Sequence, residues 1–135
     1  MNYHIKASSI SNQDAVVHIK QSNIDFGTTS ESSETLPNPA ELFLGSFASC
    51  ILKNVGRFST MMKFTYSKTI IEVKATRLEN PPRMENIVYN LTIYSNDKKL
   101  NLDLLKKNIE KFGTIYNTVK LSCSISGTIC TIENV

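Results

Sequence analysis

Several features of catalytic proteins are scarce in this sequence of 135 residues. It has two histidines, His4 and His18, and neither stands at a metal-ligand spacing from a cysteine. Neither a zinc site nor a cysteine-histidine nucleophile pair is therefore expected. The five glycines are dispersed and form no phosphate-binding loop. We therefore expect no metal and no cofactor.

The sequence also lacks long apolar runs and any concentration of charge. No stretch reaches the length of about 18 apolar residues that a transmembrane helix needs, and the first residues lack the apolar core of a secretory signal. Lysine and arginine total 15 against 12 aspartate and glutamate residues, and the basic residues are scattered. These features argue against a membrane protein and against nucleic acid as the main partner. They predict a cytoplasmic protein whose cysteines are free thiols.

The length and the order of the predicted elements indicate one domain over residues 1–135, of the α+β class. Alternating apolar residues predict strands at residues 3–10, 15–20, 69–78, 86–94 and 121–132. Helical spacing predicts one helix from Pro39 to Met62 and a second from Asn101 to Gly113. The expected order is β-β-α-β-β-α-β with antiparallel hairpins. The polar segment 27–35 is expected to be a mobile loop.

The first predicted helix has a clear N-terminal signature. Asn38 can cap the free backbone N–H groups, Pro39 suits the first helical position, and Glu41 stands three residues after the cap. The apolar residues from Leu42 to Met62 cover more than one face, which predicts a long central helix buried on several sides. Cys50 lies in the middle of this helix.

The three cysteines have no paired spacing and do not form a disulfide framework. Cys123 and Cys130 have opposite parity on the last predicted strand, so they cannot pair with each other. Cys123 is interpreted as a small core residue. A lone cysteine in a buried helix is usually inert packing, and activation of Cys50 would need a nearby cation. Lys53 and Arg57 lie close to the Cys50 face, although solvated ends of these long side chains are an equally good interpretation.

The segment from Asn38 to Cys50, with Pro39, Glu41 and small residues before the thiol, resembles the first cysteine helix of the OsmC/Ohr family. These are the osmotically inducible and organic hydroperoxide resistance proteins. The segment from Glu110 to Val119 is similar to the family's second site, which typically has a lysine and an aromatic residue before a Cys-Pro pair. The resemblance covers nearly the whole chain. It implies an OsmC-like fold in an intertwined homodimer, with both sites near the subunit interface.

The resemblance also implies a thiol peroxidase mechanism. In the family, the thiolate of the first cysteine attacks the O–O bond of an organic hydroperoxide, becomes a sulfenic acid and condenses with the second cysteine. Cys50 matches the first cysteine, and Glu41 in the same helix is a candidate to support it. Gly113 stands where the second cysteine is expected, and Thr114 replaces its proline. No arginine precedes Arg57, whereas the family commonly has one near the N-terminal hairpin.

Hypotheses of different classes follow from these residues. The first is a divergent, one-cysteine thiol peroxidase in which Cys50 is oxidised by a small hydroperoxide and reduced by an external low-molecular-weight thiol. The alternative is a non-peroxidatic homodimer that binds a small hydrophobic ligand at its interface, in a pocket lined by Phe43, Phe47 and Phe58. A third is a stress-associated dimer without small-molecule chemistry.

Overall fold

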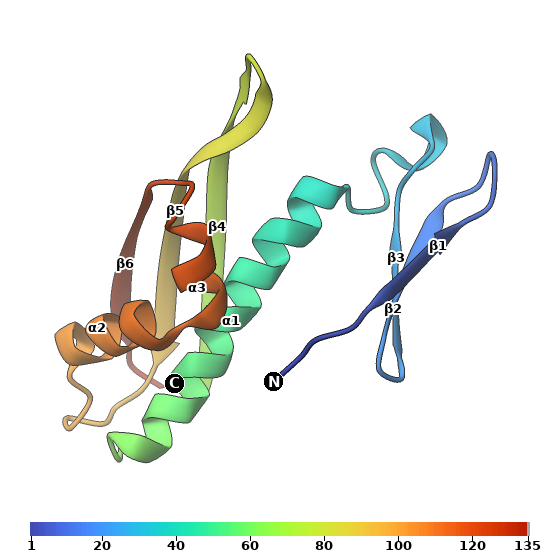
Figure 1. The fold of residues 1–135 in the computed structure, drawn as a ribbon. Coiled ribbons are helices and arrows are strands. Elements are labelled where there is room, and N and C mark those ends of the chain that lie inside the picture. The colour runs from blue at the N-terminus through green and yellow to red at the C-terminus, as the bar shows by residue number, and fades with distance from the viewer. Residues whose placement is uncertain (135) are drawn as a thin grey trace. The chain divides into compact units, whose positions relative to one another are not determined.

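The computed structural model describes residues 1–134, and the chain forms two compact units, Met1–Phe43 and Leu44–Val135. The first unit contains an antiparallel sheet in the order β1-β2-β3, as Figure 1 shows. Its strands are β1 (Lys6–Ser9), β2 (Ala15–Ile19) and β3 (Ser22–Phe26). Strands β1 and β2 were predicted, whereas β3 was not. Its sequence Ser-Asn-Ile-Asp-Phe is largely polar and exposed, and the turn before it uses Lys20 at a positive φ of 53° rather than glycine.

The polar segment 27–35, expected to be a mobile loop, is instead tied to the β1–β2 turn. It contains a single 3₁₀ turn, η1 (Ser30–Ser32). The Oδ1 atom of Asp14 accepts hydrogen bonds from the Ser32 hydroxyl at 2.6 Å and from the amides of Thr28 at 3.1 Å and Thr29 at 3.3 Å. The Ser32 hydroxyl and these amides lower the pKa of Asp14 below its ordinary value of 3.8. The Asp14 carboxylate therefore holds this segment by hydrogen bonds, although the segment has few apolar side chains to pack.

The second unit is a three-stranded sheet with helices on one face (Figure 1). The strands are β4 (Lys68–Glu79), β5 (Pro82–Tyr94) and β6 (Ile125–Ile132), in that order across the sheet. The helices are α1 (Pro39–Met61), which begins in the first unit, α2 (Leu102–Phe112) and α3 (Thr114–Val119). The α+β class is thus confirmed, and α1 ends within one residue of its predicted limit.

The C-terminal part differs from the expectation in three respects. Residues 114–119 form α3, and the last strand starts at Ile125 rather than at residue 121. Strand β6 pairs with β5 in parallel, not as an antiparallel hairpin, because α2 and α3 together form the crossover that parallel neighbours require. Cys123 therefore precedes the strand. It is half-buried, and its Sγ lies 3.3 Å from the carbonyl oxygen of Met84.

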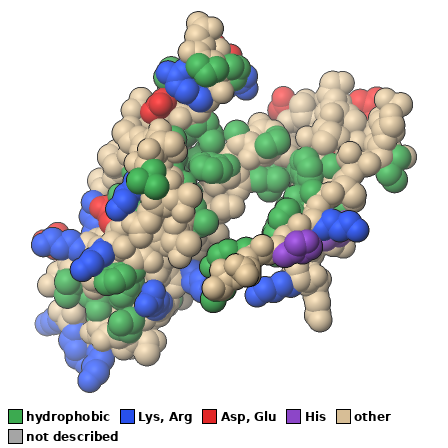
Figure 2. All heavy atoms as spheres, in the orientation of Figure 1, with side chains coloured by type: hydrophobic (Ala, Val, Ile, Leu, Met, Phe, Trp, Pro, Cys, Tyr) green, Lys and Arg blue, Asp and Glu red, His purple; other side chains and the backbone are tan. Residues whose placement is uncertain are grey.

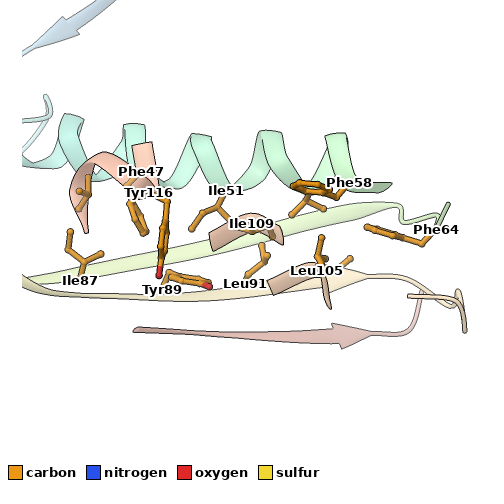
Figure 3. Close-up of a cluster of buried hydrophobic side chains, with 13 residues drawn as sticks. Phe47, Ile51, Phe58, Phe64, Ile87, Tyr89, Leu91, Leu105, Ile109 and Tyr116 are labelled. Atoms are coloured by element: carbon orange, nitrogen blue, oxygen red, sulfur yellow. The ribbon is translucent and has the colours of Figure 1, made fainter. Parts of the chain in front are cut away.

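The core of the second unit lies between α1, α2, α3 and the inner face of the sheet. Figure 3 shows α1 side chains pointing toward the sheet. Phe47, Ile51 and Val55 are fully buried and Phe58 is 2% exposed. The fully buried residues contributed by β5 and α2 are Ile87, Tyr89, Leu91, Ile93, Leu105 and Ile109.

Burial of α1 on several sides, which the sequence predicts, is not found within one chain. The buried residues follow one face of the helix, while Phe43 is 42% and Met61 is 62% exposed. Figure 2 shows hydrophobic side chains on the visible surface, together with lysine and arginine side chains at several separate places. Among residues 1–134, no helix is long and apolar enough to cross a membrane.

Candidate functional site

The start of α1 confirms the predicted cap and explains the position of Glu41. The amide of Glu41 donates to Asn38 Oδ1 at 2.8 Å, and the amide of Asn38 donates back to Glu41 Oε1 at 3.1 Å. This reciprocal pair satisfies two backbone donors at the helix start. Glu41 is thus occupied as a helix cap, and among residues 1–134 the structure shows no hydrogen bond between Cys50 and its carboxylate.

Cys50 is half-buried on α1 and faces the short connection between α2 and α3. Gly113 forms that connection, with φ −73° and ψ 117°, a conformation that any residue can adopt. A Cβ atom at Gly113 would lie 3.3 Å from Cys50 Sγ, 3.1 Å from Tyr116 Cβ and 2.9 Å from the carbonyl oxygen of Ile109. The fold therefore brings together the two positions that the resemblance matches with the family's cysteines.

Asn54 gives the Cys50 sulfur a polar contact that was not predicted from the sequence. Its Nδ2 donates to the carbonyl oxygen of Cys50 at 2.9 Å and lies 3.7 Å from Cys50 Sγ. The residue is only 8% exposed and belongs to the buried face of α1. A sequence signal existed, because an asparagine four residues after the cysteine interrupts an otherwise apolar helix face.

Neither Lys53 nor Arg57 is held at the sulfur. Both side chains are exposed, and the guanidinium of Arg57 lies 5.4 Å from the centre of the Phe58 ring. Within residues 1–134, no hydrogen bond joins either cation to Cys50. The arrangement matches the solvated interpretation of these two side chains.

A second polar cluster lies beneath the same part of α1. Glu110 on α2 accepts hydrogen bonds from the hydroxyls of Tyr116 at 3.3 Å and Tyr89 at 3.5 Å, and from Lys106 Nζ at 2.9 and 3.0 Å. Burial, and then the charge of Glu110, raises the pKa of Tyr116 to about 12 and that of Tyr89 still further. Both hydroxyls therefore stay protonated near neutral pH and act as donors to the carboxylate. This cluster was not predicted from the sequence.

Two of the three phenylalanines proposed for a ligand pocket are core residues (Figure 3). The Phe47 ring packs 6.0 Å from the Tyr116 ring and 6.1 Å from the Tyr89 ring, measured between centroids. Phe58 lies 5.9 Å from Phe112 in the same way. Phe43 is the one with a substantially exposed ring. Phe47 thus packs α1 against β5 and α3, and Phe58 packs it against α2.

Comparison with known proteins agrees with this geometry. The family described as OsmC-like protein matches residues 31–128. The OsmC-like protein of Mycoplasma pneumoniae is 17% identical, with a TM-score of 0.87 over 98% of both chains. An organic hydroperoxide resistance protein of Elizabethkingia anophelis is 13% identical, with a TM-score of 0.72 over 98% of this chain and 99% of that one. The organic hydroperoxide resistance protein OsmC of Legionella pneumophila is 13% identical, with a TM-score of 0.70 over 94% and 96%. No curated protein sequence matches the chain.

Proposed function

Because this chain belongs to the family of OsmC-like proteins, we propose that it is a thiol peroxidase with Cys50 as its single reacting cysteine. The observation that carries the proposal is the position of Cys50. Its sulfur faces the Gly113 turn, at the place matched with the family's second site, and receives an amide contact from Asn54. Two structural neighbours are described as organic hydroperoxide resistance proteins, which supports a stress-response role.

The proposed first step is a two-electron transfer at sulfur. The Cys50 thiolate attacks one oxygen of an organic hydroperoxide ROOH, an S–O bond forms, and the O–O bond breaks. The departing alkoxide takes up a proton and leaves as the alcohol ROH. Cys50 is oxidised to a sulfenic acid, and the hydroperoxide is reduced.

The proposed second step uses an external thiol, because Gly113 has no sulfur with which the sulfenic acid can condense. A low-molecular-weight thiol attacks the sulfenic sulfur, releases water and leaves a mixed disulfide on Cys50. A second molecule of the thiol then regenerates Cys50 and departs as the symmetrical disulfide. Cys123 is half-buried next to the Met84 carbonyl, and Cys130 is exposed on β6, so neither occupies the Gly113 position.

The assembly and location belong to the same proposal. A homodimer would cover exposed apolar side chains of α1 such as Phe43 and Met61, and would thereby bury the helix on the several sides that its sequence predicts. A cytoplasmic location would keep the three cysteines reduced, and all three are free in the structure. Size-exclusion chromatography with light scattering measures the proposed dimer directly.

The deciding experiment compares wild type with Cys50→Ser and, as a matched control, Cys130→Ser. Each reduced protein receives one equivalent of cumene hydroperoxide, and peroxide loss is followed together with dimedone trapping of sulfenic acid. Wild type and Cys130→Ser should consume peroxide and carry one dimedone adduct at residue 50, whereas Cys50→Ser should do neither. Equal peroxide consumption by Cys50→Ser and wild type would refute the proposal. A hydrophobic ligand that co-purifies with an unreactive dimer would instead favour the binding alternative.

A further inference from the structure

We infer that Asn54 is a positioning residue for Cys50. The side-chain NH₂ group of Asn54 is directed at both the sulfur and the carbonyl oxygen of Cys50 and thereby stabilises the thiolate. Only the role of the thiolate as the reacting group rests on the proposed function. The geometry itself concerns Asn54 and Cys50 alone.

The orientation of the Asn54 amide follows from the chemistry of its neighbour. A backbone carbonyl oxygen can only accept hydrogen bonds, so the group 2.9 Å from the Cys50 carbonyl must be the NH₂ end of the amide. The same nitrogen lies 3.7 Å from Cys50 Sγ. It carries two hydrogens, and one remains for the sulfur when the other binds the carbonyl.

The placement of Asn54 is costly for the helix and needs an explanation. The residue is 8% exposed on the face that also buries Ile51, Val55 and Phe58. A buried amide is unfavourable unless it is hydrogen-bonded, and asparagine is a weaker helix former than leucine. An apolar side chain would suit this face better. The NH₂ group of the amide is nevertheless satisfied, because it donates to Cys50.

A hydrogen-bond donor at sulfur favours the charged form over the neutral form. An N–H bond to an anion is stronger than one to a neutral acceptor, so the contact stabilises the Cys50 thiolate more than the thiol. The charged residues of α1 near this turn, Lys53 and Arg57, are exposed. On the α2–α3 side, the Tyr116 hydroxyl is bound to Glu110. Asn54 is thus the polar group that the fold brings to the sulfur.

The test measures how fast iodoacetamide alkylates Cys50 as a function of pH, with peptide mass spectrometry to separate Cys50 from the other two cysteines. Asn54→Leu removes both hydrogen bonds. Asn54→Ser leaves a hydroxyl that can still bind the Cys50 carbonyl but is too short to reach the sulfur. Asn108→Leu is the matched control, because Asn108 Nδ2 contacts a different sulfur, Met62 Sδ, at 3.5 Å.

We expect the midpoint of the rate-against-pH curve to rise by about one pH unit in Asn54→Leu and Asn54→Ser, the lower end of the effect of a hydrogen bond to a charged group. The alkylation rate at pH 7 should fall about threefold and the rate on the alkaline plateau should rise about threefold, because the more basic thiolate is the stronger nucleophile. Asn108→Leu should behave as wild type. An unchanged midpoint in folded Asn54→Leu or Asn54→Ser would overturn the inference.

A second measurement needs no variant and stands even if the substitutions unfold the protein. In wild type, the side-chain amide resonances of Asn54 should shift with the same pH midpoint as Cys50 alkylation, and those of Asn108 should not. Asn54 resonances that do not follow this midpoint would overturn the inference. Peroxide consumption separates the two ideas: a wild type that consumes none refutes the proposed peroxidase, whereas the Asn54 shifts and the change of midpoint in the variants test the positioning role independently.

Discussion

Replacing Gly113 with cysteine should create a disulfide with Cys50. In a disulfide, an S–S bond of about 2.04 Å and ordinary bond angles place each Cβ about 3.0 Å from the partner's sulfur. A Cβ at Gly113 would already lie 3.3 Å from Cys50 Sγ. The φ and ψ of Gly113 suit a cysteine, so a shift of a few tenths of an ångström brings the two residues into bonding geometry.

The magnitude follows from the loop that the new bond would close. A loop of about 60 residues restricts the unfolded chain enough to contribute about 4 kcal/mol in the chain-entropy model. The new Cβ would also crowd the Ile109 carbonyl at 2.9 Å and Tyr116 Cβ at 3.1 Å, which costs about 1 kcal/mol. The oxidised form of the variant should therefore be about 3 kcal/mol more stable than wild type. For a chain of this length, that raises Tm by about 10 °C.

The assay oxidises Gly113→Cys with diamide, digests it without reduction and maps the linked peptides. We expect one peptide pair that joins residues 50 and 113, and a Tm that falls when dithiothreitol is added. Gly113→Ala carries the same Cβ without sulfur and serves as the control for crowding. The reasoning fails if the introduced thiol stays free after diamide, or if it pairs with Cys123 while Cys50 remains alkylatable. Replacing diamide with cumene hydroperoxide then asks whether the Cys50 sulfenic acid itself forms this bond.

Two further changes test other parts of the structure. Gly127→Ala should lower stability by about 3 kcal/mol and Tm by about 10 °C, because the new Cβ would lie 2.0 Å from a ring carbon of the fully buried Tyr89; Gly45→Ala, with no heavy atom within 4 Å, should be neutral or slightly stabilising. The pKa of Asp14 is lowered in the folded state. The ionised carboxylate therefore stabilises the fold at pH values above its ordinary pKa of 3.8, and this stabilisation is lost as the pH falls below that value. Thermal unfolding between pH 6 and 2.5 should therefore show a smaller loss of Tm on acidification in Asp14→Asn than in wild type, and equal losses would contradict the assignment.

The elements with strong local signals were predicted well. The start of α1 was predicted from Asn38, Pro39 and Glu41, because a helix cap depends on residues three positions apart, and the structure contains both of the expected cap hydrogen bonds. The family resemblance was likewise visible in this helix and is confirmed. Strand β3 was missed because its pairing partner β2, and not its own composition, decides its conformation.

The C-terminal part was harder to predict for a similar reason. The sequence before α3 offered no cap signal, because its N-cap residue is Gly113, which has no side chain to accept a hydrogen bond. The predicted last strand was therefore extended too far toward the N-terminus. Its parallel pairing with β5 depends on the crossover through α2 and α3, which alternation of apolar residues within a strand cannot reveal.

By itself, the sequence determined that Cys50 lies within a long capped helix and that residue 113 has no thiol, because both are local properties of the chain. Only the tertiary structure decided what surrounds the sulfur. Packing of α2 and α3 against α1 places Gly113 beside Cys50, and the burial of one helix face turns Asn54 from a surface polar residue into a donor directed at the thiol. The carboxylate of Glu110 likewise gathers Tyr89 and Tyr116 from separate elements. The contacts of Gly113 with Cys50 and of Tyr89 with Glu110 join residues far apart in the chain, and they exist only once the apolar core has formed.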